Sequence, residues 1–274
     1  PGTVETLRVF REKLIGMDPR DIEGINAVMN RAVAYAGTAK AAVDIACHDI
    51  LGKAAGLPLY KLLGGLSNTI ETDMTVGIDT PELMAAAAKE HVAAGFRVIK
   101  TKVGTNIADD IARVKAIREA VGDDVKIRLD ANQGWHAREA VELLKRLNEY
   151  DIELVEQPVR RFDFEGLKYV TANSPVPVMA DESCWDSKDA LRLVSERAVD
   201  FINIKLMKCG GLWEAKKIVN IAEAAGVEIM LGCMAEESGI AINAAAALGA
   251  ALGNITRADL DASFSLKALP YEGG

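Results

Sequence analysis

The sequence predicts an α/β protein, a (β/α)8 barrel of the TIM type with a partial, mostly helical capping domain at the N-terminus. From about residue 70 onward, eight short apolar segments alternate with helical patterns, which is typical of parallel βαβ units. Eight such units in roughly 200 residues close most simply into a barrel. No G-x-G-x-x-G follows an early strand, so a doubly wound open sheet is the weaker alternative. The earlier residues are helical and carry no barrel strands.

The predicted strands are short, and each ends in polar residues. They cover residues 71–78, 97–103, 125–131, 152–158, 176–182, 200–206, 227–233 and 256–262. The clearest helix lies between the first two strands, where Thr80 suits the N-cap, Pro81 the first helical position and Gly95 the C-terminal stop. The segment 240–253 is apolar nearly all round, so we expect it to be buried.

Three parts of the chain follow from this pattern. Residues 1–66 are expected to form a partial helical capping domain whose N-terminal part is missing. Residues 67–265 form the predicted barrel. Residues 266–274 are expected to be a truncated tail.

Composition excludes several classes of partner. A net charge of −8 argues against a nucleic-acid partner, and no apolar run reaches the roughly 18 residues that span a bilayer. The four cysteines are scattered without a C-x-x-C pair, which fits a reducing compartment. We therefore expect a cytoplasmic protein with a small-molecule partner, and the sequence is also compatible with a homo-oligomer.

Charged residues gather at the carboxyl ends of the predicted strands. They are Lys100 and Lys102 on the second strand, Asp130 and Asn132 on the third, Glu156 on the fourth, Asp181 and Glu182 on the fifth, Lys205 on the sixth, and Asp259 and Asp261 on the eighth. One such residue alone is most simply a cap or turn residue. From the second strand to the sixth, however, they recur every 25 residues or so, roughly one βα unit, which predicts a ring at the mouth of the barrel, where barrel enzymes keep their active sites.

The residue types in this ring point to metal-assisted proton transfer. Asp130, Glu156 and Asp181 offer hard oxygen ligands without His or Cys, which suits Mg²⁺, or Mn²⁺ as a substitute. Lys102 and Lys205 lie on opposite strands, so they could take a proton from one face of an α-carbon and return one to the other. A metal would stabilise the enediolate formed in between.

Lys100 has a supporting role in this hypothesis. A lysine acts as a base only as a neutral amine. The ammonium group of Lys100, two residues from Lys102 and on the same side of the strand, together with the metal, would favour that form. Lys100 could also contact a substrate carboxylate.

With these motifs in hand, the sequence resembles the enolase superfamily, in the muconate lactonizing enzyme subgroup. The resemblance rests on "IKTKVG", "DAN" at Asp130, "VEQP" at Glu156, "ADES" at Asp181 and "NIKLMKCGG" at Lys205. The seventh strand, "IMLGCM", has no His, which argues against the mandelate racemase subgroup. Within the subgroup, the D-x-D of the eighth strand resembles dipeptide epimerases of the L-Ala-D/L-Glu type.

That resemblance implies a fuller site. Asp259 and Asp261 would receive the ammonium terminus of a dipeptide, and Cys233 and Met234 of "GCMAEESG" would line the pocket beside it. Asn132, Glu182 and Asn203 are expected to support the ligands and bases from behind. The implied activity is Mg²⁺-dependent dipeptide epimerisation by 1,1-proton transfer. The alternatives are a cycloisomerase, an o-succinylbenzoate synthase or an N-acylamino acid racemase and, in another class, a catalytically idle scaffold subunit.

Overall fold

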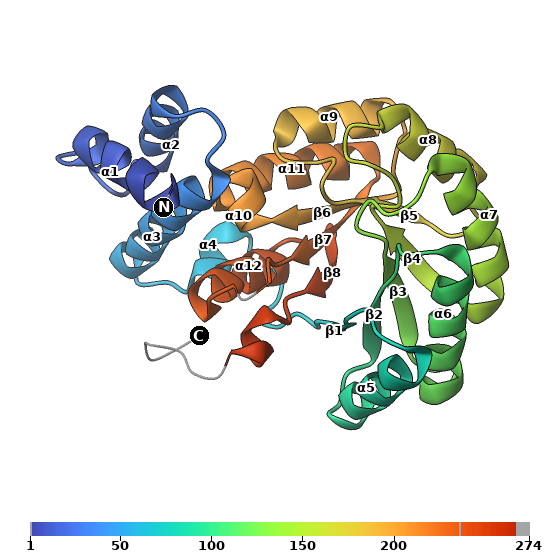
Figure 1. Ribbon diagram of the computed structural model, residues 1–274. Helices are drawn as coiled ribbons and strands as arrows, with labels where there is room; N and C mark the ends of the chain where they lie inside the picture. Colours follow the sequence, from blue (N-terminus) through green and yellow to red (C-terminus); the bar gives the residue numbers. More distant parts are fainter. Residues whose placement is uncertain (1, 236, 267–274) are drawn as a thin grey trace.

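The predicted barrel is confirmed by a computed structural model, which describes residues 2–235 and 237–266. Eight parallel strands form one sheet in chain order, closed into a nearly complete barrel (Figure 1). The strands are β1 (Met74–Val76), β2 (Val98–Lys102), β3 (Lys126–Asp130), β4 (Ile152–Glu156), β5 (Val178–Ala180), β6 (Phe201–Lys205), β7 (Glu228–Gly232) and β8 (Ile255–Asp259).

The eighth strand is shorter at its carboxyl end than the sequence pattern indicated. It begins at Ile255 and stops at Asp259, where the ladder to β7 ends with the pair Gly232 and Asp259. Asp261 lies beyond the strand and precedes the short 3-10 helix η2 (Ala262–Ser265). The two acids of the D-x-D motif therefore belong to different local structures, one in the sheet and one in a turn.

Helices cover the outside of the barrel, as the alternating pattern predicted (Figure 1). They are α5 (Pro81–Ala93), α6 (Ile107–Val121), α7 (Ala137–Leu147), α8 (Phe164–Asn173), α9 (Ser187–Ser195), α10 (Leu206–Cys209), α11 (Leu212–Ala225) and α12 (Gly239–Ala251), with a 3-10 turn η1 (Asn148–Tyr150) before β4. Thr80 caps α5 as expected, because its side chain accepts a hydrogen bond from the Leu83 amide.

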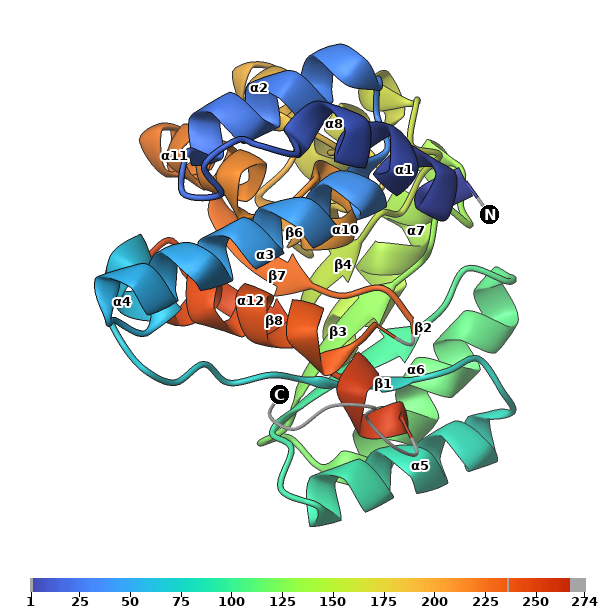
Figure 2. The same cartoon turned by 90° about the vertical axis from the view of Figure 1, so that its left-hand side faces the viewer.

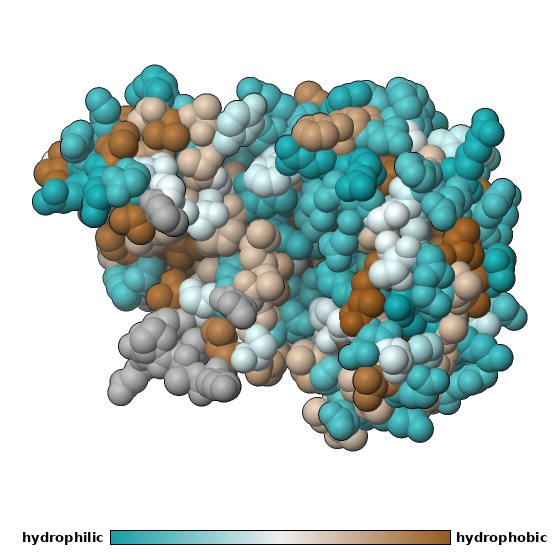
Figure 3. All heavy atoms as spheres, in the orientation of Figure 1, coloured by the Kyte–Doolittle hydropathy of each residue, from teal (hydrophilic) through white to brown (hydrophobic). Residues whose placement is uncertain are grey.

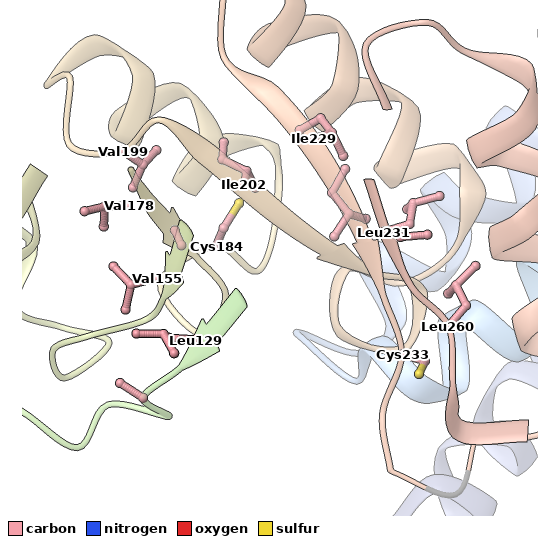
Figure 4. Close-up of a cluster of buried hydrophobic side chains, with 14 of the residues drawn as sticks. Leu129, Val155, Val178, Cys184, Val199, Ile202, Ile229, Leu231, Cys233 and Leu260 are labelled. Carbon is pink, nitrogen blue, oxygen red and sulfur yellow. The ribbon is translucent and has the colours of Figure 1, made fainter. Parts of the chain in front are cut away.

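The core lies between the strands and these helices. Leu129, Val155 and Val178 come from consecutive strands β3, β4 and β5, and all three are fully buried (Figure 4). Since side chains alternate along a strand, the neighbours of these residues face the inside of the barrel. The inner face is therefore free to carry the charged residues of the site.

The barrel closes at a seam between β8 and the chain entering β1. The ladder runs from β1 to β8, and the seam is bridged by a backbone hydrogen bond from the Asp73 amide to the Ala258 carbonyl, at 3.2 Å. The Leu260 amide donates to Thr72 Oγ1 at 2.8 Å, and the Thr75 amide donates to Asp261 Oδ2 at 2.8 Å. Side chains thus complete a closure that the backbone makes only in part.

Residues 2–63 form a helical unit beside the barrel: α1 (Gly2–Leu14), α2 (Ile22–Ala32), α3 (Gly37–Ala55) and α4 (Leu59–Leu63). Phe10, Ile25 and Met29 give it a small hydrophobic core of its own. Helix α3 packs against α10 of the barrel (Figure 2). At this contact a Cβ on Gly37 would collide with the backbone carbonyls of Met207 and Lys208, so only glycine allows the approach.

A buried polar cluster also joins the helical unit to the barrel. Asp44 on α3 accepts hydrogen bonds from the Leu212 amide at the start of α11 and from the side chain of Asn26, at 2.6 and 2.9 Å. The domain boundaries at residues 66 and 265 stay predictions. Of the tail expected at 266–274, residues 267–274 lie outside the described residues.

The face shown in Figure 3 is mostly hydrophilic, with hydrophobic residues scattered over it. In the part of the chain that the structure describes, no helix has both the length and the apolar character needed to cross a membrane.

Candidate active site

Strand β2 carries the two lysines that the sequence singled out, at different depths. Lys100 is 2 % exposed, and its Nζ lies 2.6 Å from Glu156 Oε2, 2.6 Å from Asp259 Oδ2 and 3.1 Å from Asp130 Oδ2. Burial lowers the pKa of Lys100, but these carboxylates outweigh it and raise that pKa well above its usual value. Lys100 is therefore a fixed ammonium at the centre of the acidic residues.

Lys102 stands nearer the solvent than Lys100. Its side chain is 27 % exposed, and its Nζ lies 2.6 Å from Asp130 Oδ2 and 2.9 Å from Asn132 Oδ1. Asn132 adopts a positive φ of 41°, a conformation that costs energy for a residue other than glycine and is frequent at active sites. The turn after β3 thus directs the amide oxygen of Asn132 at the lysine.

Three buried carboxylates lie at the ends of neighbouring strands. Asp130 ends β3 and pairs in register with Glu156, which ends β4, while Asp181 follows β5. Asp130 Oδ1 accepts the Asn132 amide at 3.0 Å, and Glu156 Oε1 accepts Asn203 Nδ2 at 2.7 Å. Burial and the charge of Asp130 raise the pKa of Glu156 to about 7. The carboxylates are thus close enough to repel one another.

Lys205 ends β6, four strands from β2 in the ring and hence across the barrel from Lys102. Its Nζ lies 2.8 Å from Asp181 Oδ2. Burial lowers the pKa of Lys205, but the carboxylates of Asp181 and Glu156 outweigh it and raise that pKa. The two lysines therefore approach the acidic cluster from opposite sides.

Lys208 was missed by the sequence reasoning. It lies on α10, one helical turn after Lys205, and is 7 % exposed. Its Nζ contacts Asp181 Oδ1 and donates to the Asn203 carbonyl at 3.1 Å. Burial raises the pKa of Asp181, but Lys208 and Lys205 outweigh it and hold that pKa well below its usual range. The signal was present in "NIKLMKCGG", where a second lysine follows three residues after the first.

Gln157, a buried residue directly after β4, holds the loop after β5 in place. Gln157 Oε1 accepts the amides of Asp181 and Ser183 at 2.9 and 3.1 Å. Glu182 faces the cavity, and its Oε2 is buried without a hydrogen-bond donor among the described residues. These hydrogen bonds fix the backbone after β5, where Asp181 and Glu182 line the cavity.

The two acids of the D-x-D motif differ in exposure. Asp259 is 4 % exposed and bonded to Lys100, whereas Asp261 is half-buried and has Thr75 and Cys233 as neighbours. Both line the same cavity, together with Cys233 and Met234.

A cavity of about 910 Å³ at the mouth brings most of the predicted residues together. The predicted site residues that line it are Lys100, Lys102, Asn132, Asp181, Glu182, Lys205, Cys233, Met234, Asp259 and Asp261. Asp130, Glu156 and Asn203 are fully buried behind them. Met74, Met207 and Trp185 also line the cavity with apolar surface, which the sequence pattern did not predict.

The three carboxylates fit a hard divalent cation by their chemistry. Among the described residues no three acidic, His or Cys side chains are arranged to hold a metal ion as they stand. Their oxygens face lysine ammonium groups, which satisfy the negative charge. Oxygen-only donors on Asp130, Glu156 and Asp181, buried and mutually repelling, are the set that Mg²⁺ prefers. A cation there would relieve the repulsion that raises the pKa of Glu156.

Facing lysines and a cluster of acids at the carboxyl ends of the strands indicate a barrel enzyme, since barrel enzymes place their active sites at this end. Residues 83–271 match the family description "Enolase C-terminal domain-like", and residues 4–64 match "Mandelate racemase / muconate lactonizing enzyme, N-terminal domain". The chain belongs to this family, within the enolase superfamily.

Several relatives are similar along the whole chain. A "hydrophobic dipeptide epimerase" of Enterococcus faecalis is 59 % identical over 273 residues, which are 100 % of this chain and 77 % of the relative. An "L-Ala-D/L-Glu epimerase" of Bacillus subtilis is 45 % identical over 97 % of this chain and 73 % of the relative. The crystal structure of a dipeptide epimerase from E. faecalis, complexed with Mg and L-Leu-L-Tyr, has a TM-score of 0.99 and 59 % identity, covering 100 % of this chain and 77 % of that one.

Proposed function

We propose that this chain is a Mg²⁺-dependent dipeptide epimerase, an isomerase that inverts the α-carbon of the C-terminal residue. The observation that carries the proposal is the pair Lys102 and Lys205, which stand on opposite strands on either side of three buried carboxylates. Asp259 and Asp261 face the same cavity and give it a second, anionic end. The relatives named as dipeptide epimerases support the same reaction.

The lysines would move the proton. Nζ of one removes the α-proton from one face of the substrate, and Nζ of the other returns a proton to the opposite face. Lys102 and Lys205 are held beside Asp130 and Asp181 at 2.6 and 2.8 Å, which fixes where each amine stands. Mg²⁺, held by Asp130, Glu156 and Asp181, would bind the substrate carboxylate and stabilise the negative charge that develops on it.

Asp259 and Asp261 would bind the other end of the substrate. A dipeptide is a zwitterion, so its ammonium terminus needs anions. Asp259 and Asp261 supply them on the cavity wall. Each is fixed by a neighbour, Asp259 by Lys100 and Asp261 by the Thr75 amide. This anionic end distinguishes a free dipeptide from an N-acylated amino acid, which lacks the positive charge.

The cavity wall favours hydrophobic side chains on the substrate. Met74, Met207, Met234 and Trp185 line it, and methionines adapt to apolar groups of different shape. The name of the E. faecalis relative, a hydrophobic dipeptide epimerase, agrees with this proposal. A cytoplasmic location stays a prediction, supported by four buried cysteines that form no disulfide. Homo-oligomerisation and replacement of Mg²⁺ by Mn²⁺ also stay predictions.

The test is α-proton exchange in D₂O, followed by NMR with Mg²⁺ present. L-Leu-L-Tyr is compared with its N-acetylated form, which removes only the ammonium charge. We expect deuterium at the α-carbon of the C-terminal residue and appearance of the epimer with the free dipeptide, and much slower exchange with the N-acetylated one.

Other outcomes separate the alternatives. Equal exchange with both compounds would favour an N-acylamino acid racemase. Absence of exchange from a mixed pool of dipeptides would favour an idle scaffold. Lys115→Ala, which removes an exposed lysine on α6, serves as the control variant and should leave the exchange rate unchanged.

A further inference from the structure

Asp73 is a fully buried acid that the proposed reaction does not use. It lies directly before β1, at the seam of the barrel, where its amide donates to the Ala258 carbonyl. Its carboxyl group accepts a hydrogen bond from Arg128 of β3, and the backbone bond at the seam places Asp73 beside the end of β8, where Asp259 directly follows Ala258. A buried carboxyl group between two such neighbours needs an explanation, since acids are almost never fully buried unless they are paired.

The contacts of the two acids leave one oxygen on each without a donor. Asp73 Oδ2 accepts Arg128 Nη1 at 2.7 Å, and Asp259 Oδ2 accepts Lys100 Nζ at 2.6 Å. Among the described residues, Asp73 Oδ1 and Asp259 Oδ1 are both buried without a hydrogen-bond donor. Two ionised carboxylates only accept hydrogen bonds, so neither could satisfy the other. One proton on either acid would give both oxygens a hydrogen-bond partner, because the protonated acid donates to the ionised one.

We propose that Asp73 is a neutral carboxylic acid whose hydroxyl donates to Asp259, and that this bond makes Asp73 a positioning residue for the Asp259 carboxylate. The second half rests on the proposed function, in which Asp259 binds the substrate ammonium group. The result is a chain of hydrogen bonds across the barrel, from Arg128 to Asp73, from Asp73 to Asp259, and from Lys100 to Asp259.

The surroundings decide which acid keeps the proton. Lys100 lies 2.6 Å from Asp259, and this contact favours the ionised form there. Arg128 is shared, because its Nε also binds Glu153 at 2.6 Å. Its positive charge therefore stabilises an ionised Asp73 less than Lys100 stabilises an ionised Asp259. Burial and the charge of Asp259 raise the pKa of Asp73 well above its usual value, although Arg128 and Lys100 oppose this. Burial raises the pKa of Asp259 too, but Lys100 outweighs it and lowers that pKa.

The consequence for the site is that both oxygens of Asp259 have a fixed partner. Lys100 holds Oδ2 and Asp73 holds Oδ1, so the plane of the carboxylate is set before substrate arrives. Two residues later on the same segment, the Thr75 amide holds Asp261 Oδ2 at 2.8 Å. The stretch from Asp73 to Thr75 therefore orients both acids proposed to bind the ammonium group, without supplying an acid or a base itself.

The decisive comparison is between Asp73→Asn and Asp73→Ala. An asparagine side chain has the shape of a neutral carboxylic acid, can donate through Nδ2 to Asp259 and can accept from Arg128. We expect Asp73→Asn to keep KM for L-Leu-L-Tyr within about threefold of the unaltered protein and Asp73→Ala to raise KM about tenfold, with a smaller change in kcat, since tenfold corresponds to about 1.4 kcal/mol. The control is Thr101→Val on β2, which removes a buried hydroxyl that has no hydrogen-bond partner within the described part of the chain.

A second measurement needs no substrate and remains useful if Asp73→Ala fails to fold. The infrared spectrum at pH 7 with Mg²⁺ should contain a protonated carboxyl band that disappears in Asp73→Asn and persists in Thr101→Val. Identical bands in the unaltered protein and Asp73→Asn would overturn the shared proton, as would an Asp73→Asn protein as impaired in KM as Asp73→Ala. Lack of dipeptide turnover in the unaltered protein, with the band present, would instead overturn the proposed function.

Discussion

The two ends of the barrel both carry dense charge networks, in which the buried cations differ. At the mouth, lysines contact Asp130, Glu156, Asp181 and Asp259 beside a cavity of about 910 Å³. At the opposite end, Arg128 and Arg257 bind Glu153 and border a cavity of about 180 Å³. Arginine stays charged and binds through a rigid planar fork, whereas lysine is a flexible point charge that can lose its proton. The difference separates an end suited to proton transfer from one suited to holding the strands together.

Glu156 at the mouth and Glu153 at the opposite end respond to their surroundings in opposite ways. At the mouth, burial and a neighbouring carboxylate raise the pKa of Glu156 to about 7. At the other end, burial raises the pKa of Glu153, but Arg128 and Arg257 outweigh it and lower that pKa. Glu156 is therefore less compensated by positive charge than Glu153, although lysines hold the pKa of Asp181 and of Asp259 low, and a divalent cation is proposed at the mouth only.

Loss of either mouth lysine should have the largest effect. Lys102→Ala and Lys205→Ala each remove one of the two proposed bases, and we expect kcat for epimerisation to fall by about 10²- to 10⁴-fold. Each variant should still exchange the α-proton of one epimer, because the remaining lysine faces one side of the α-carbon. NMR with each pure epimer in D₂O measures this, and circular dichroism checks the fold. Normal turnover of either variant would remove that lysine from the mechanism.

Removal of the metal should abolish turnover and lower stability. After chelation, added Mg²⁺ should raise Tm with increasing concentration, by an amount equivalent to about 2.7 kcal/mol at one hundred times Kd. Asp181→Asn should remove this response. Asp49→Asn, an exposed change on α3, should keep it. A Tm response equal in all three proteins would place the cation elsewhere.

At the opposite end, Arg128→Lys should cost stability and should lower kcat far less than the loss of a mouth lysine does. One ammonium cannot bind Asp73 and Glu153 as the guanidinium does, at 2.7 and 2.6 Å, so the free energy of unfolding should fall by about 2 kcal/mol. Lys126→Met removes only an exposed contact to Glu153, at 3.5 Å, and should cost less than about 1 kcal/mol. Urea unfolding measures both. A fall in kcat as large as that of Lys205→Ala would erase the distinction between the ends.

The smallest expected effect is on acid stability. Because the pKa of Glu153 is lowered in the folded protein, this group stabilises the fold above its unfolded pKa, and that contribution is lost as pH falls through the folded value. Glu153→Gln cannot titrate, so its unfolding free energy should decrease less steeply with falling pH below about 4.5. Denaturant unfolding between pH 3 and 6 tests this. A steeper decrease in the variant would contradict the lowered pKa.

The barrel and the ring of charges at its mouth could be predicted because both follow from periodicity. Each strand ends about one βα unit after the last, so Asp130, Glu156 and Lys205 were brought together by counting alone. The burial of each side chain, in contrast, could not be predicted from this spacing. Lys100 and Lys102 look equivalent in sequence, but the register with β3 and the position of Asp259 bury one and leave the other partly exposed.

Residues that act across the seam or from a turn were also beyond sequence reasoning. Asp73 looks like an ordinary polar residue at the start of a strand, and its relation to Asp259 exists only because β8 returns beside β1. Lys208 comes back to Asp181 because α10 makes a single helical turn after β6. Neither contact has a periodic signature along the chain, since each depends on how distant segments meet.

The contact at Gly37 limits how this protein can be recombined with its relatives. The start of α3 touches the carbonyls of Met207 and Lys208 with no space for a methyl group, and Lys205 lies two residues before this contact. A hybrid that takes its helical unit from one parent and its barrel from another must therefore inherit both sides of this contact as a matched pair. Exchange of the first 63 residues to alter substrate preference would otherwise shift one of the two proposed bases.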